Sequence, residues 1–157
     1  VIALFSCSKR SGMTGYRSGF LAGDANLIET YSRLRPNLGV ATPLFVERAA
    51  TAAWSDDAHV AERNAIFSQK RALFREFFEG AGIPFWGHDA TFFLWFRVPG
   101  GEDGEAYCRR LLDATGIVTI PGTYFGAGGE GLARVALVPP LEECAAAITR
   151  WREWALA

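Results

Sequence analysis

The chain has 157 residues, of which half are hydrophobic, and its 16 basic and 17 acidic residues leave a net charge of -1. A chain of this length is large enough to bury a core of its own. The balanced charge provides no global field that would recruit nucleic acid or an acidic membrane surface, so we expect neither as a partner.

No apolar run approaches the roughly 20 residues of a membrane-spanning helix, and no signal-peptide pattern opens the chain. Cys7, Cys108 and Cys144 lie far apart, with no Cys-x-x-Cys and no nearby histidine pair. Because metal sites need clustered ligands, we expect no metal, and we predict reduced thiols in a cytoplasmic protein. His59 and His88 are isolated in the sequence, and we assign neither of them a role.

A polar stretch with several glycines, residues 6–20, separates two apolar runs at residues 1–5 and 19–23. The first run is continuous and β-prone, which is typical of a strand buried on both faces. Because the chain starts at Val1, without methionine and inside this apparent strand, we expect a fragment of a longer protein.

Lys9 follows directly after the end of the first strand. Partial desolvation at such a place would lower the pKa of the amine and make it a nucleophile towards an aldehyde. Arg17, with the hydroxyl groups of Ser6 and Ser8, has the donors to bind a dianionic phosphate. A reactive lysine beside a phosphate site is what pyridoxal 5'-phosphate requires. The alternative interpretation is a basic surface turn in which Lys9 and Arg17 are solvated charges.

The loop resembles that of the fold-type I, class I/II aminotransferases, which depend on pyridoxal phosphate. Their pattern of Ser, any residue, Ser-Lys and then Arg, any residue, Gly is present as Ser6-Cys7-Ser8-Lys9 and Arg17-Ser18-Gly19. Within that family, the complete sequence of residues 8–20 is most similar to that of bacterial succinyldiaminopimelate transaminases, which are enzymes of lysine biosynthesis. The resemblance implies the C-terminal portion of such an enzyme, with Lys9 as the catalytic residue and Ser6, Ser8, Lys9 and Arg17 binding the cofactor.

Three helices are predicted after the loop. Asp24 opens the first, and Pro36 prevents its continuation beyond Arg35. Thr42 and Pro43 predict an N-cap followed by proline at the first helical position of the second helix. The third helix runs from a cap at residues 56–57 to about residue 79, where glycines end it, and its apolar residues repeat at helical spacing.

The second half of the chain predicts a mostly antiparallel sheet covered by helices. A strand is predicted at residues 92–98, with one face formed by Phe92, Leu94, Phe96 and Val98 and the other by Phe93, Trp95 and Arg97. Further strands are predicted at residues 117–120 and 132–138. A helix is predicted at residues 104–114, with Cys108, Leu111 and Leu112 facing inward, and a final helix is predicted after residues 139–140. The glycine-rich segment 121–131 lacks the strand-then-helix context of a nucleotide-binding loop, so we reject that function for it.

Arg134 is a charged residue in the middle of the last predicted strand. Its planar guanidinium can form two parallel hydrogen bonds with a carboxylate. In the family that the chain resembles, an arginine in this place binds the α-carboxylate of the substrate. The alternative is a solvent-facing arginine on an edge strand. Arg35 is a second candidate, for the distal acidic group of the substrate, and its alternative is an arginine that interacts with the C-terminal dipole of a helix.

The resemblance implies an α/β fold with three parts. Residues 1–55 are the end of the large cofactor-binding domain and contain two strands and the polar loop at residues 6–20, here called the lysine loop. Residues 56–82 form an interdomain helix, and residues 83–157 form the small C-terminal domain. The resemblance also implies a homodimer that transfers an amino group between glutamate and a 2-oxo acid, with succinyldiaminopimelate as the expected substrate. The alternatives are an aminotransferase for aspartate, alanine or aromatic amino acids, or a non-catalytic cofactor-sensing domain of a transcription regulator. Residues 1–157 alone are expected to be inactive.

Overall fold

The structure is a computed structural model that describes residues 1–39, 41–87 and 89–156. The chain forms two compact units, Val1–Arg63 and Asn64–Ala157, and the boundary between them falls inside one helix. The predicted three-part division stays a prediction, and His88 lies outside the described residues. In the part of the chain that is described, no helix is long and apolar enough to cross a membrane.

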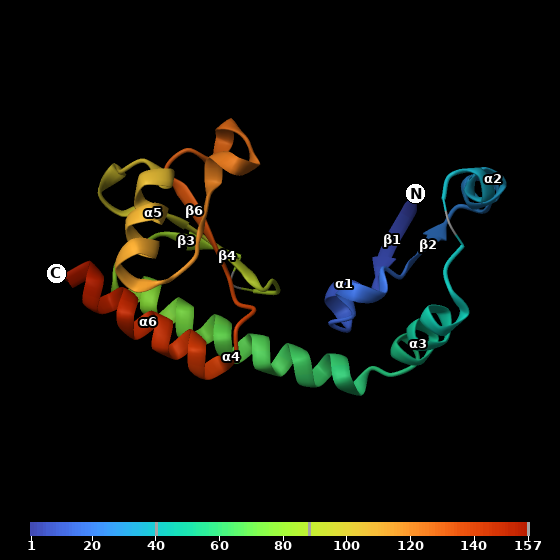
Figure 1. Cartoon of the computed structure of the whole chain (residues 1–157), viewed down its shortest axis with the longest axis horizontal. Helices are drawn as coiled ribbons and strands as arrows, with labels where there is room; N and C mark the ends of the chain where they lie inside the picture. The colour runs from blue at the N-terminus through green and yellow to red at the C-terminus, as the bar shows by residue number, and fades with distance from the viewer. Residues whose placement is uncertain (40, 88, 157) are drawn as a thin grey trace. The chain divides into compact units, whose positions relative to one another are not determined.

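The first unit begins with a two-stranded antiparallel sheet (Figure 1). Strand β1 spans Ile2–Ser6 and strand β2 spans Gly19–Gly23, in a register that pairs Phe5 with Phe20. The two rings stack with their centroids 4.7 Å apart. The two apolar runs of the sequence therefore form neighbouring strands, and the lysine loop connects them.

The prediction that the first strand is buried on both faces is wrong for this structure. Four of the five residues of β1 are exposed, and Leu4 retains 79% of its accessible surface. The physical reason is that, among the described residues, β1 pairs with β2 alone, and a two-stranded ribbon cannot cover both of its own faces.

Two helices complete most of the first unit, α2 (Ala25–Leu34) and α3 (Leu44–Trp54). The Asp24 carboxylate caps α2 by accepting hydrogen bonds from the next free backbone N–H groups, as predicted. A 3-10 turn, η2 (Arg35–Asn37), follows α2 and contains the proline that ends it. The predicted cap of α3 is wrong by one residue. Pro43 itself is the N-cap and no side chain caps the helix, because α3 starts at Leu44.

Helix α4 (Ala58–Gly80) is the longest element, with 23 residues. Asp56 accepts a hydrogen bond from the Ala58 backbone N–H at 2.8 Å, which satisfies one of the free donors at the start of the helix. In its C-terminal half the helix buries three aromatic side chains, Phe74, Phe77 and Phe78. The predicted apolar stripe is thus confirmed in the C-terminal half of α4, whereas Ile66 in the first half is 48% exposed.

The second unit contains a four-stranded antiparallel sheet in the order β3-β4-β6-β5. Its strands are β3 (Phe85–Trp86), β4 (Phe93–Arg97), β5 (Ile120–Pro121) and β6 (Leu132–Ala136). Every pair is antiparallel, and β4 faces β6 with Trp95 opposite Arg134. Helices α4, α5 (Gly104–Thr115) and α6 (Leu141–Leu156) contribute the other half of its core (Figure 1). The predicted α/β class with a mostly antiparallel sheet is confirmed.

Alternation along the two central strands decides which side chains enter this core. Leu94 and Phe96 of β4 and Ala133 and Val135 of β6 are buried beneath the helices, as the period of two predicts. Phe93, Trp95 and Arg134 are therefore on the opposite face of the sheet. Trp151 of α6 is fully buried among the core aromatic rings.

Several details of this unit differ from the prediction. The strand predicted at 117–120 is reduced to β5, because Ile117 and Thr119 turn into the core after Gly116 ends α5 in a left-handed conformation. Short strand β3 was not predicted. In α5 the predicted inward residue Leu112 is 44% exposed, and Tyr107 takes the buried position. Cys7, Cys108 and Cys144 are all free and buried.

A buried hydrogen bond connects α5 to α6. The Trp151 indole Nε1–H donates to the Tyr107 hydroxyl at 2.9 Å, and burial raises the pKa of this phenol. Replacement of Tyr107 by phenylalanine leaves the buried indole N–H without its acceptor, so the free energy of unfolding should fall by about 1–3 kcal/mol. Urea denaturation of the 157-residue chain measures this loss. The matched control is Tyr124→Phe at a ring that is 68% exposed, where the change should stay within roughly 0.5 kcal/mol.

Candidate functional site

The lysine loop is folded around the backbone of Cys7. The Cys7 N–H donates to the Ser18 carbonyl oxygen at 3.1 Å, and the Cys7 carbonyl oxygen accepts from the N–H groups of Ser11 at 3.0 Å and Met13 at 3.3 Å. The Cys7 side chain is fully buried. Residues Cys7–Arg10 form one helical turn, α1, so Lys9 sits on a locally ordered backbone directly after β1.

Ser6 organises the loop from within. Its hydroxyl accepts a hydrogen bond from the Ser8 N–H at 3.1 Å and donates to the Ser18 carbonyl oxygen at 3.3 Å. The serine therefore joins the beginning of the loop to its end. Its contact with a cofactor stays a prediction. In this structure the hydroxyl proton of Ser6 forms the hydrogen bond to the Ser18 carbonyl oxygen.

The structure brings Ser8 and Arg17 together. The Nη1 atom of Arg17 lies 3.5 Å from the Ser8 hydroxyl oxygen and 2.9 Å from the Thr14 carbonyl oxygen. Arg17 is the one non-glycine residue with a positive φ in the described part of the chain, at φ 51° and ψ 40°. A left-handed backbone is unusual outside glycine and persists where the surroundings favour it. Here it turns the guanidinium back over the loop beside a hydroxyl group.

Lys9 is exposed, so the burial that the sequence predicts for it is wrong for this structure. The cause is the same as for β1. Within the described residues, the strand that precedes Lys9 is exposed on most of its length and shields little of the loop.

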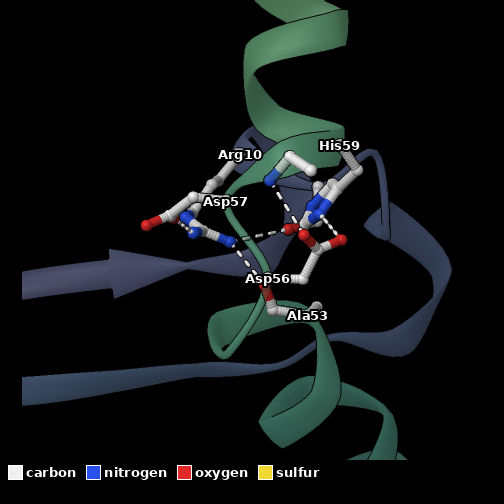
Figure 2. Close-up of polar contacts among 7 residues, drawn as sticks. Arg10, Ala53, Asp56, Asp57 and His59 are labelled. Carbon is white, nitrogen blue, oxygen red and sulfur yellow. Dashed lines mark hydrogen bonds and ion pairs between the residues drawn. The ribbon is translucent and has the colours of Figure 1, made fainter.

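Arg10 anchors the loop to the junction between α3 and α4, a role that sequence reasoning missed (Figure 2). Its Nη1 donates to the Ala53 carbonyl oxygen at 2.7 Å, its Nη2 forms an ion pair with Asp57, and its guanidinium carbon lies 4.5 Å from the centre of the Trp54 ring. The contacts join residues 43 or more positions apart in the sequence, and no local pattern reveals them.

Asp56 and His59 complete the same junction. The His59 Nδ1 lies 2.9 Å from an Asp56 carboxylate oxygen, and this hydrogen bond, together with the Ala58 backbone N–H, lowers the pKa of Asp56 (Figure 2). The pair stabilises the first turn of α4, where a negative charge is favourable. This contact is structural, and we assign His59 no catalytic role.

Replacement of Arg10 by alanine should loosen the lysine loop without unfolding the chain. Loss of a charge-assisted hydrogen bond and a ring contact should cost about 1–3 kcal/mol. Protection of the Ser11 and Met13 amides from hydrogen exchange should then fall roughly tenfold or more. The control is Arg33→Ala, which removes an exposed i,i+4 ion pair with Glu29 and should leave both amides unchanged. Unchanged exchange in Arg10→Ala would contradict the anchoring role.

Arg134 is half-buried on the sheet face opposite the core, and aromatic rings contact it. Its guanidinium carbon lies 4.1 Å from the ring centre of Phe93, 4.3 Å from that of Phe125 and 6.0 Å from that of Trp95. A guanidinium favours such contacts with ring faces and still has N–H donors in its plane. Arg134 is thus a partly desolvated cation whose donors suit a carboxylate.

Arg35 lies at the start of the 3-10 turn η2 and is half-buried. Its guanidinium nitrogen Nη1 would be 2.6 Å from a Cβ atom placed on Gly39, so the side chain folds along its own turn. Lys9, Arg17 and Arg35 belong to the first unit and Arg134 belongs to the second. Three or more side chains that could together bind a metal ion are not found among the described residues.

The family profile described as aminotransferase class I and II matches residues 1–150 of this chain. The chain is 36% identical over 150 residues to 4-dedimethylamino-4-oxo-anhydrotetracycline transaminase of Streptomyces rimosus, covering 96% of this chain and 41% of that protein. It is 38% identical over 135 residues to LL-diaminopimelate aminotransferase of Natranaerobius thermophilus, covering 84% of this chain and 34% of that one.

A solved structure supports the same relationship. The probable N-succinyldiaminopimelate aminotransferase of Thermus thermophilus matches with a TM-score of 0.86 and 31% identity, over 98% of this chain and 41% of that one. The chain thus spans between about a third and two fifths of the length of these proteins. Proteins of this family depend on pyridoxal phosphate. The sequence, the fold and the lysine loop agree, and the chain belongs to the class I and II aminotransferase family.

Proposed function

We propose that this chain is the part of a pyridoxal phosphate-dependent aminotransferase that supplies the reactive lysine, one side of the phosphate site and the arginine for the α-carboxylate. The observation that carries this proposal is the position of the Arg17 guanidinium, 3.5 Å from the Ser8 hydroxyl, on the loop that also holds Lys9. A cation and a hydroxyl at this separation can bind two oxygens of one phosphate.

The residues present fit the phosphate group of the cofactor. Arg17 is exposed, and its guanidinium has N–H donors besides the Nη1 group that donates to Thr14 and Ser8. The Ser8 hydroxyl can rotate and donate a hydrogen bond of its own. Bound there, the cofactor would withdraw electrons from the α-carbon of the substrate. Ser6, through its bonds to Ser8 and Ser18, would keep the loop in the required conformation.

Lys9 would move the proton in this proposal. An uncharged amine can accept a proton from the α-carbon of an amino acid and return it in the reverse direction, as a general base and then a general acid. The short helical turn α1, fixed by Ser6 and Arg10, would limit the positions that the lysine can reach. Arg134 would bind the α-carboxylate and so orient the bond that breaks.

We propose N-succinyldiaminopimelate with 2-oxoglutarate as the substrate pair, because a similar solved structure has that probable activity and a relative acts as LL-diaminopimelate aminotransferase. Arg35 is proposed for the distal carboxylate. Aspartate, alanine or aromatic amino acids are the alternatives. A cofactor-sensing regulator is the other class, and a DNA-binding segment in the complete protein together with no turnover would favour it. The homodimer and the cytoplasmic location remain predictions.

The test of this proposal measures cofactor affinity in the full-length protein that contains this chain. Arg17→Ala should weaken binding of pyridoxal phosphate roughly tenfold to a hundredfold, since it removes a charge-assisted contact to the phosphate. Binding of pyridoxal, which has no phosphate, should change little. An equal loss for both compounds, or no turnover by the wild-type protein with any amino acid and 2-oxoglutarate, would contradict the proposed function.

A further inference from the structure

The glycine-rich segment before β6 is folded tightly on itself. It contains two 3-10 turns, η4 (Gly122–Phe125) and η5 (Ala127–Gly129), which meet at Gly126 with a φ of 123°. The backbones of Gly122 and Gly129 are in contact, so a Cβ atom on either residue would overlap the carbonyl group of the other. The close approach requires glycine at both places and holds the segment in one conformation.

This conformation places Phe125 at Arg134. The ring centre of Phe125 lies 4.3 Å from the guanidinium carbon and 5.1 Å from the ring centre of Trp95, edge to face at 71°. Phe125 nevertheless remains 52% exposed, so it contributes little to the core. A large, half-exposed aromatic residue that is fixed by a loop against a cation is better suited to orienting that cation than to stabilising the fold.

Arg134 is thereby held from two directions. Phe93 contacts it from β4 within the sheet, and Phe125 contacts it from the glycine-rich segment. Because a long arginine side chain otherwise samples many rotamers, the second ring reduces the conformational entropy that carboxylate binding would remove. The geometry points to a preorganised guanidinium.

We propose that Phe125 is a positioning residue for Arg134, and that contact between Gly122 and Gly129 sets its place. The inference rests on the proposed function, because it assigns Arg134 the substrate carboxylate. It adds a specificity determinant from outside the lysine loop. Through Arg134, Phe125 would favour substrates with an α-carboxylate over amines without one.

The first experiment does not depend on activity. In the 157-residue chain, the order parameter of the Arg134 Nε–H, measured by nitrogen-15 relaxation, should be high and should fall in Phe125→Leu. Tyr124→Leu, at the more exposed neighbour on the same turn, is the matched control and should leave it unchanged. An Arg134 Nε–H that stays equally ordered in Phe125→Leu would overturn the proposal.

The second experiment uses the full-length protein. Phe125→Leu should raise KM for the amino acid roughly tenfold, the size expected from loss of a partly desolvated cation–ring contact, with a smaller effect on kcat. The KM of the decarboxylated amine should not change, and Phe125→Tyr should restore the amino-acid KM. Equal losses for acid and amine would reduce Phe125 to a structural residue and would overturn the proposal.

The glycine contact has its own matched pair. Gly129→Ala should reproduce the effect of Phe125→Leu, because the new methyl group meets the Gly122 backbone, whereas Gly128→Ala meets no atom within 4 Å and should behave as wild type. Identical behaviour of the two alanine variants would contradict the role of the contact. Wild-type protein without turnover would remove the proposed function, while a lower order parameter in Phe125→Leu would still support the positioning of Arg134.

Discussion

Replacement of Lys9 by arginine should abolish transamination by the full-length protein, with a loss of about a thousandfold or more. Arginine keeps the positive charge and the approximate length of the side chain, but it stays protonated in proteins and is neither a general base nor a nucleophile. The substitution therefore separates the two interpretations of this residue. A solvated surface cation would tolerate arginine, whereas a reactive amine would not.

Chemical trapping gives the second readout for Lys9. Borohydride reduction of the wild-type protein with its cofactor should attach the cofactor to the peptide that contains Lys9, and this label should disappear in Lys9→Arg. Arg10→Lys is the matched control, because it adds an amine at the next position and should not be labelled. A label on any other lysine, such as the buried Lys70, would disprove the assignment.

Replacement of Arg134 by lysine should cost about 2–5 kcal/mol in the specificity constant for an amino acid. A lysine ammonium is a compact point charge and lacks the planar guanidinium that can bind both carboxylate oxygens. The substitution also removes the contacts of the guanidinium with the rings of Phe93 and Phe125. Cofactor binding, which we assign to the first unit, should stay normal.

The matched substrate for this experiment is the decarboxylated amine. If Arg134 binds the α-carboxylate, the amine lacks the group that the arginine recognises, and its specificity constant should change little in Arg134→Lys. The measurement compares both substrates in both proteins. An equal fractional loss would identify Arg134 as a structural residue of β6.

Local patterns in the sequence were sufficient for most of the fold. The period of two in β4 correctly placed Leu94 and Phe96 on the same face, which the structure shows to be the buried one, and the capping residue Asp24 located the start of α2. The two-residue strand β3 was missed because a pair of aromatic residues is too short to show a period. Leu112 was placed inward on apolarity alone, although the helical position of Tyr107 faces the core.

In the candidate site, too, a contact within one short loop was predicted, whereas contacts that depend on the tertiary fold were not. The approach of Arg17 to Ser8 was predicted, since both lie in one short loop. The contacts of Arg10 with Ala53 and of Phe125 with Arg134 were not predicted. The first joins residues that are far apart in the sequence, and the second depends on the conformation of an irregular, glycine-rich segment. The exposure of Lys9 was also missed, because burial of a strand depends on the neighbours that cover it and not on its own composition.

The continuity of α4 has a consequence for limited proteolysis. Proteases bind extended backbone, and a helix must unwind locally before it can be cut. Because the boundary between the two units lies inside Ala58–Gly80, no extended linker is available there, and Phe74, Phe77 and Phe78 hold the later turns in the core. Cleavage should begin elsewhere in the chain, and the fragment that retains the second unit should also retain the whole of α4.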